Sequence, residues 1–148
     1  MVNLETAAGI AWRVFELAPS IPGRLTDPRL VFLRGFPSGS CDSMAYATAG
    51  MLFERGLGDW WVVTQVNDEG DRHVWLEWRS ETHQPLFSID ATAHQFVGIE
   101  EPFIGHGPTP SSRWFSEPES AVRFTDLADY WPRAGDVALL EYVQAYMP

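Results

Sequence analysis

Lysine is missing from the chain, and cysteine occurs once, as Cys41, in 148 residues. A single thiol excludes an internal disulfide, so Cys41 is either a small buried apolar residue or a reactive group. The absence of lysine fits a codon bias, and it would also leave an acyl-transferring enzyme no lysine amine of its own to modify. Long apolar runs are absent as well, so we expect a soluble protein without a membrane partner.

Basic residues are few. The chain has 10 arginines against 20 acidic residues, which gives a formal net charge of −10 at pH 7. Binding to a phosphate backbone depends on clustered lysine and arginine, so nucleic acid is not an expected partner. The N-terminal segment has no basic leader followed by an apolar stretch and a cleavage site, so we expect a cytoplasmic protein, with export as an effector left open.

The residues that are present suit one globular domain spanning 1–148. Hydrophobic residues make up 45% and aromatic residues 14% of the chain, and this length supports one continuous core but not two. Helical and strand-like spacings both occur, which predicts an α+β fold. We expect no cofactor, and the oligomeric state is left open.

Two helices are predicted from apolar residues at helical spacing. Asn3 can cap a helix over residues 4–17. A second helix is expected from Cys41 to about Arg55, with Gly56 where a C-terminal glycine belongs. Cys41 therefore lies in the first turn of a core helix.

Strand-like runs follow the second helix. The segments WWVVTQV, RHVWLEW and LFSIDAT, separated by turn signals, predict an antiparallel meander. The proline-rich region from Phe96 to Pro118 is expected to form a long loop over the surface or over a cleft. Two weaker helical segments close the chain: SEPESAVRFTDLADYW, with a Ser116 cap and Glu119 three residues on, and DVALLEYVQAYM, with Asp136 as its cap.

The position of Cys41 suits a nucleophile. The start of a helix offers unpaired backbone N–H groups and a partial positive charge, both of which favour a thiolate. The preceding loop, PSGS at 37–40, is small, so a substrate carbonyl could approach the sulfur closely.

His73 and Asp90 suit the other two roles of a thiol-dependent site. A cysteine nucleophile needs an imidazole that takes and returns protons, and a carboxylate that orients this imidazole. Alternation in RHVWLEW places His73, Trp75 and Glu77 on one face of a strand, with Glu77 expected to be solvated, and Asp90 ends the next strand. Adjacent antiparallel strands could bring Asp90 beside His73, against the helix that carries Cys41.

Three ordered motifs carry a family resemblance. The segments GSCDSMAYATAGMLFERGLG, RHVWLEW and FSIDATAHQF, found within roughly 37–96, resemble the transglutaminase-like superfamily of broadly papain-like folds. The resemblance implies a core helix bearing Cys41, packed on an antiparallel sheet bearing His73 and Asp90. It also implies that these three residues act as nucleophile, base and orienting group, in a family that includes proteases, amidases, deamidases and protein crosslinkers.

The resemblance is incomplete in the segment before the cysteine. Many papain-like enzymes carry a glutamine or another donor there that completes the oxyanion hole, and RGFPSG offers no such side chain. The backbone N–H of Cys41 together with Ser40, Ser38 or Gln65 is a candidate for this role, and Trp75 is a candidate wall of the cleft.

Other interpretations of the same residues stay open. Cys41 could be a structural thiol, His73 a strand histidine bound to backbone, and Asp90 a residue that merely ends a strand. His73 and Asp90, with His94 and His106, could in principle hold a metal, although no HExxH or paired CxxC motif supports a metal site.

The sequence therefore predicts a cysteine-dependent acyl-transfer enzyme of the amidase, peptidase, deamidase or transglutaminase type. Such an enzyme would act on a peptide or protein amide through a thioester that water or an amine resolves. The alternative is an inactive protein that retains the fold and serves as a binding or inhibitory protein.

Overall fold

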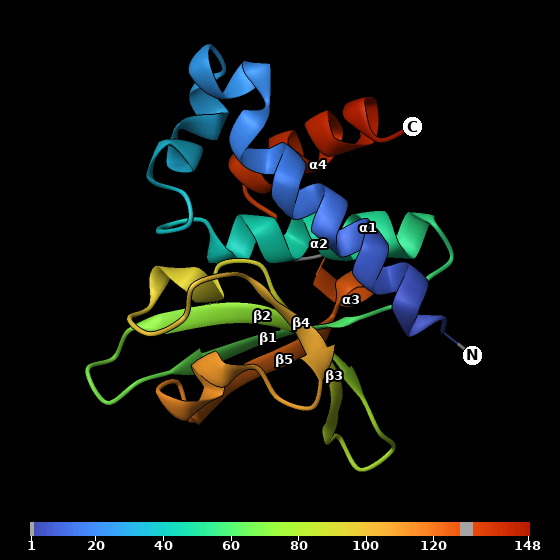
Figure 1. Ribbon diagram of the computed structural model, residues 1–148, viewed down its shortest axis with the longest axis vertical. Coiled ribbons are helices and arrows are strands. Elements are labelled where there is room, and N and C mark those ends of the chain that lie inside the picture. Colours follow the sequence, from blue (N-terminus) through green and yellow to red (C-terminus); the bar gives the residue numbers. More distant parts are fainter. Residues whose placement is uncertain (1, 128–131) are drawn as a thin grey trace.

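The computed structural model describes residues 2–127 and 132–148, and it has the α+β architecture expected from the sequence. Figure 1 shows helices layered on one face of a sheet. Within the described residues the sheet has five strands in the order β4-β3-β2-β1-β5, and each neighbouring pair is antiparallel. The strands are β1 (Trp61–Val66), β2 (Arg72–Arg79), β3 (Pro85–Asp90), β4 (Phe103–His106) and β5 (Glu117–Arg123).

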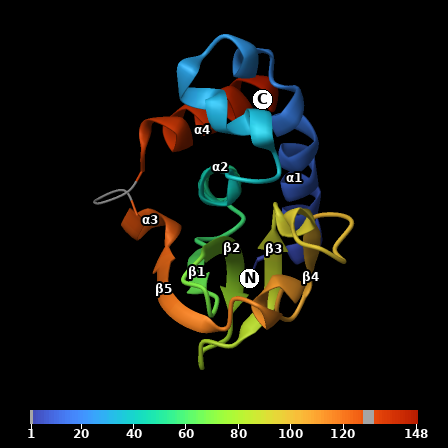
Figure 2. The same cartoon turned by 90° about the vertical axis from the view of Figure 1, so that its left-hand side faces the viewer.

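Helix α2 lies at the centre of the molecule, between the sheet and the two other long helices (Figure 2). Its residues from Ser43 to Leu52 are all buried, because neighbours cover it on every side. The helices are α1 (Leu4–Leu17), α2 (Cys41–Glu54), the short α3 (Phe124–Leu127) and α4 (Ala134–Tyr146). Short 3-10 helices connect them or follow strands: η1 (Ala18–Ser20), η2 (Pro22–Leu25), η3 (Pro28–Gly35), η4 (Ala93–Gln95) and η5 (Pro110–Arg113).

The capping residues that the sequence offers are used at both predicted helices. The Asn3 side chain accepts a hydrogen bond from the Thr6 backbone N–H at 3.0 Å, which fixes the start of α1. Gly56 follows the end of α2 with a φ of +71°, a left-handed conformation that glycine adopts without a steric penalty. Both helices therefore span the predicted residues to within one position.

The two faces of the sheet have separate apolar clusters. Val74 and Leu76 on β2 belong to the main core, which lies between the sheet and the helices. Trp75, between them in the chain, belongs to a smaller cluster on the opposite face together with Val63 and Phe115. The predicted alternation along β2 is confirmed.

The prediction of a helix over 116–131 is wrong in its first half. Residues Glu117–Arg123 form β5, an edge strand whose Trp61↔Arg123 to Val66↔Glu117 register pairs it with β1. The local capping signal at Ser116 is outweighed, because the free edge of β1 offers a ladder of backbone hydrogen bonds that no local pattern reveals. Residues 128–131 lie outside the described residues.

The long loop predicted over 96–118 is also partly wrong. It contains β4, which pairs with β3 from Phe87↔His106 to Asp90↔Phe103, and then the 3-10 helix η5. Phe115, at its end, packs on the sheet face away from the helices. The segment therefore adds an edge strand and then covers part of this second face. In the part of the chain that the structure describes, none of the helices has both the length and the apolar character needed to cross a bilayer.

Candidate active site

Cys41 is the first residue of α2 and is partly exposed. The Met44 backbone N–H donates to the Ser40 carbonyl and starts the helical hydrogen bonds. Gly39 has a φ of +77°, and nothing lies within 4 Å of the position that a Cβ would occupy. A turn that favours glycine, with open space around it, therefore precedes a thiol at the positive end of a buried helix.

The start of α4 is tied to the start of α2 beside the thiol. The buried carboxylate of Asp136 accepts a hydrogen bond from the Ser43 hydroxyl through Oδ1, and from the Arg133 backbone N–H at 2.9 Å through Oδ2. The Arg133 guanidinium forms an ion pair with Asp42. Asp136 is the third residue of α4, in a capping box with Arg133, and not the N-cap that the sequence suggested.

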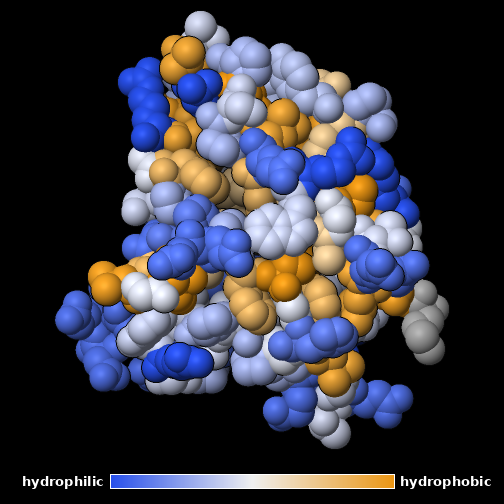
Figure 3. Space-filling model, in the orientation of Figure 1, coloured by the Kyte–Doolittle hydropathy of each residue, from blue (hydrophilic) through white to orange (hydrophobic). Residues whose placement is uncertain are grey.

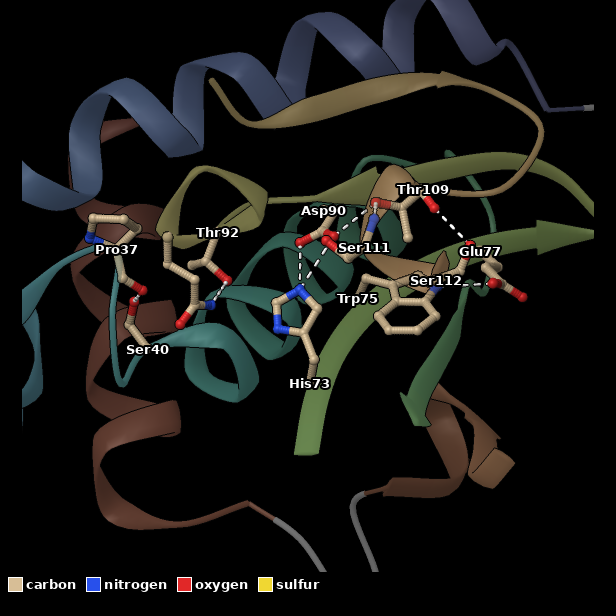
Figure 4. A network of polar contacts seen from close by, with 11 residues as sticks. Pro37, Ser40, His73, Trp75, Glu77, Asp90, Thr92, Thr109, Ser111 and Ser112 are labelled. Carbon is tan, nitrogen blue, oxygen red and sulfur yellow. Dashed lines mark hydrogen bonds and ion pairs between the residues drawn. The ribbon is translucent and has the colours of Figure 1, made fainter. Parts of the chain in front are cut away.

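His73 and Asp90 form a buried pair. The imidazole Nε2 lies 2.9 Å from Asp90 Oδ1 and 3.1 Å from Oδ2 (Figure 4). The β2–β3 ladder ends at Leu76↔Ile89, so Asp90 lies one position and His73 three positions beyond the paired part of these two strands. The predicted approach of Asp90 to His73 is found, although not through direct pairing of the two residues.

The pKa of His73 is raised to about 9. Burial is the strongest single influence and acts to lower the pKa, but the hydrogen bond to Asp90 and the nearby Cys41 thiol together outweigh it. The imidazole therefore carries a positive charge at neutral pH, with Nε2–H donating to Asp90.

The second ring nitrogen of His73 is the one left for the thiol. Cys41 is close enough to raise the pKa of His73, yet Nδ1 is buried and has no partner in hydrogen-bonding geometry among the described residues. We interpret the thiol and the imidazole as adjacent but not aligned, as nucleophile and base often are before substrate binds.

Three aromatic rings and one hydroxyl hold this pair in place. Ring centroids of Phe96, Phe115 and Trp75 lie 4.8, 5.3 and 5.6 Å from that of His73. The buried Thr109 hydroxyl donates to Asp90 Oδ2 at 2.7 Å, on the oxygen that His73 contacts at the longer distance. The aromatic rings exclude water, and Thr109 fixes the carboxylate.

Sequence reasoning missed Thr109. Its hydroxyl oxygen also accepts from the Ser111 backbone N–H at 3.3 Å, as the N-cap of η5. The signal was the threonine directly before Pro110, since proline favours the first position of a helical turn and threonine the cap. That signal locates a cap but does not show that it faces Asp90.

The residues considered for the oxyanion hole and the cleft lie in different places. The Ser40 hydroxyl is buried and donates to the Pro37 carbonyl at 3.0 Å. The Trp75 indole N–H donates to Glu77 at 2.7 Å, which leaves Glu77 buried and not solvated as predicted. Gln65 is opposite His73 on β1 and lines a hollow that does not include Cys41. The backbone N–H groups of the first turn of α2, which have no intrahelical partner, remain candidate donors for an oxyanion.

His94 and His106, the other two histidines considered for a metal site, each pack against a phenylalanine ring. His94 stacks against Phe36 at 5.5 Å, and burial lowers its pKa. His106 packs on Phe87 at 5.1 Å, on β4. Over residues 2–127 and 132–148 no three histidine, cysteine, aspartate or glutamate side chains gather in a way that could hold a metal ion, so the metal interpretation gains no support.

A hollow of about 470 Å³ opens at the thiol, and we call it the thiol hollow. Two ion pairs stand at its walls: Arg133 with Asp42 from the helices, and Arg72 with Glu119 at 2.6 Å from the sheet. The other lining residues are Gly39, Cys41, Thr64 and Val74. The volume is in the range of small-ligand sites, and four of its eight lining residues are charged.

Comparisons of the chain with protein-family models, with curated proteins and with solved structures gave no match.

Proposed function

We propose that this protein is a cysteine-dependent acyl-transfer enzyme with a transglutaminase-like, broadly papain-like arrangement. The observation that carries the proposal is the buried His73–Asp90 pair beside Cys41, with Nε2 engaged and Nδ1 free. Further support comes from the chain order Cys, His, Asp on a helix start and two adjacent strands. Its substrate is a peptide or protein amide.

The reaction proceeds in two steps. The Cys41 thiolate attacks the amide carbonyl carbon and forms a C–S bond. The intermediate collapses with cleavage of the C–N bond, as the His73 imidazolium gives its Nδ1 proton to the leaving amine. Water or a second amine then attacks the thioester, His73 takes the proton of the attacking group, and the sulfur leaves as the thiolate.

The resting state supports this sequence. A positive imidazolium at neutral pH, held by Asp90, stabilises a thiolate beside it and supplies the proton that the leaving amine needs. Backbone N–H groups at the start of α2 stabilise the oxyanion. Thr109 and the aromatic rings hold the imidazole and the carboxylate in the same relative orientation through both steps.

The first test is the pH dependence of thiol alkylation, followed by intact mass. Because Cys41 is the only cysteine, each added mass reports this residue. For an ordinary thiol the iodoacetamide rate falls roughly 70-fold between pH 8 and pH 6. We expect a fall of less than about threefold for the folded protein and the full fall for the protein in urea or for His73→Gln. A steep fall in the folded protein would favour an inactive binding protein.

The second test is acyl transfer itself. With p-nitrophenyl acetate we expect a burst of nitrophenolate equal to the enzyme concentration and an acetyl group on Cys41. Cys41→Ala should keep the fold by circular dichroism and lose the burst. An undiminished burst in Cys41→Ala would reject the mechanism.

A further inference from the structure

Two apolar side chains on the loops that frame the site are unusually exposed. Val97 is 95% exposed and Trp114 is 46% exposed, whereas the nearby Phe115 is buried. Two hollows of about 880 and 860 Å³ meet along Val97, Arg113 and Trp114. We call Val97 and Trp114 the apolar ridge, and the two hollows its flanks.

Both flanks carry negative charge. The β1–β2 turn contributes Asp68, Glu69 and Asp71 to the larger hollow, and the segment after Val97 contributes Glu100 and Glu101 to the other. Two guanidinium groups face these five carboxylates, those of Arg72 and Arg113, and that of Arg72 is already bound to Glu119. In Figure 3, hydrophobic atoms lie next to strongly hydrophilic ones at the left-hand side, where Figure 1 shows the β1–β2 turn.

The ridge adjoins the catalytic pair. Arg72 lines both the thiol hollow and the larger flank, so the two spaces share a wall. Phe96 has its ring centroid 6.2 Å from Trp114 and 4.8 Å from His73. The ridge therefore borders both the thiol hollow and the His73 side of the site.

We propose that the apolar ridge is the docking surface for a cationic peptide segment of the substrate that carries an apolar side chain, an inference that rests on the proposed function. Trp114 and Val97 contact the apolar side chain, and the carboxylates of the flanks attract lysine or arginine on either side of it. Phosphate-bearing partners are disfavoured by the same carboxylates. A second copy of this chain is disfavoured too, because it carries the same charges and a net charge of −10.

The test measures binding without chemistry, in the Cys41→Ala protein. Three synthetic ten-residue peptides are titrated calorimetrically: arginine-rich with a central phenylalanine, the same with alanine in place of phenylalanine, and a glutamate-rich analogue. We expect the first to bind, the second to bind about tenfold more weakly, and the third not to bind. Binding of the first should weaken with added salt, because the flanking charges are exposed.

Surface variants then locate the site. Trp114→Ala should weaken binding of the first peptide about tenfold, while Phe53→Ala, at a side chain of matched 45% exposure on α2, should leave it unchanged. Val97→Ser is a second ridge variant and should also weaken binding of the first peptide, because it removes an apolar contact without adding charge and the side chain is 95% exposed. Asp68→Asn with Glu69→Gln should reduce the salt dependence.

Each outcome decides the proposal. Equal binding of the glutamate-rich peptide, no binding of any peptide, or ridge variants that bind like the parent would overturn it. The pH dependence of Cys41 alkylation in the wild-type protein is measured in parallel, because it reports the thiol chemistry independently of peptide binding. If the alkylation rate of Cys41 changes little between pH 6 and pH 8 but no peptide binds, only the docking surface is rejected. If the first peptide binds but the alkylation rate falls steeply toward pH 6, the acyl-transfer function is rejected and the ridge remains a peptide-binding surface.

Discussion

The two faces of the sheet are covered in different ways. Toward the helices, residues from α1, α2, α4 and the strands form the continuous main core. On the other face, among the residues that the structure describes, only Val63, Trp75 and Phe115 form a buried apolar cluster. Beside this small cluster the second region buries His73, Glu77, Asp90 and Thr109, whereas the polar groups buried on the helix side, such as Ser43 and Asp136, accompany a much larger apolar core.

We expect the main core to determine most of the stability, and the second face to determine the properties of the candidate site. Burial of apolar area is the dominant favourable term in folding, and most of it lies on the helix side. A buried polar group contributes little net stability when satisfied and costs more when its partner is lost. We therefore expect substitutions in the main core to destabilise the protein without changing the reactivity of Cys41. Substitutions on the second face should change this reactivity with a smaller loss of stability.

The largest effect is expected in the main core. Leu52→Ala, at a fully buried position of α2, should lower the free energy of unfolding by about 2–5 kcal/mol, because it removes apolar contacts and leaves a cavity. Urea denaturation measures this loss, and Leu86→Ala, at a side chain 49% exposed on β3, is the control with little change. The alkylation profile of the folded variant should stay like that of the wild type. A shifted profile would mean that the two regions are coupled.

The second effect concerns His73 and pH. Its pKa is raised from 6.5 to about 9 in the folded protein, so the charged form is favoured by folding. This stabilisation is fully present below pH 6.5 and is lost as the pH rises through about 9, and its size is on the order of 3 kcal/mol. Urea denaturation should show that the free energy of unfolding falls more between pH 6.5 and pH 9.5 in the wild type than in His73→Gln. Parallel losses in the two proteins would argue against a charged imidazole.

The smallest effect is expected at Thr109. Thr109→Val keeps the shape but removes the hydrogen bond to Asp90, so unfolding free energy should fall by about 1 kcal/mol. The ratio of the alkylation rate at pH 6 to that at pH 8 should be several-fold lower in Thr109→Val than in the wild type, since the carboxylate is less well oriented. Thr109→Ser should restore the profile, because it restores the donor. Equal profiles for valine and serine would limit Thr109 to a structural role as a helix cap.

Local sequence patterns predicted the parts of the fold that depend on neighbouring residues. Helices α1 and α2 follow from apolar spacing with Asn3 and Gly56 at their ends, and β1, β2 and β3 follow from alternation between turns. Both edge strands were missed, because β4 and β5 have weak patterns of their own and exist through pairing with β3 and β1. Glu119, expected in a helical capping box, binds Arg72 across the β-sheet instead.

The candidate site, like the fold, has parts that the sequence predicted and parts that it did not. The sequence offered Cys41 at a helix start and His73 and Asp90 on successive strands, and the structure brings His73 and Asp90 into contact with Cys41 nearby. Their catalytic roles stay predictions. Thr109 and Arg133 could not be found from the sequence, because their partners, Asp90 and Asp42, are distant along the chain.

The sequence by itself determined which residues are candidates for chemistry, because one thiol, its place at the start of a helix and the alternation around His73 are properties of short segments. Only the tertiary structure decided what surrounds them. The charge on the imidazole, the hydroxyl that holds Asp90 and the ion pairs at the thiol hollow all arise from contacts between distant segments. Such contacts depend on how the chain packs, and no local pattern encodes them.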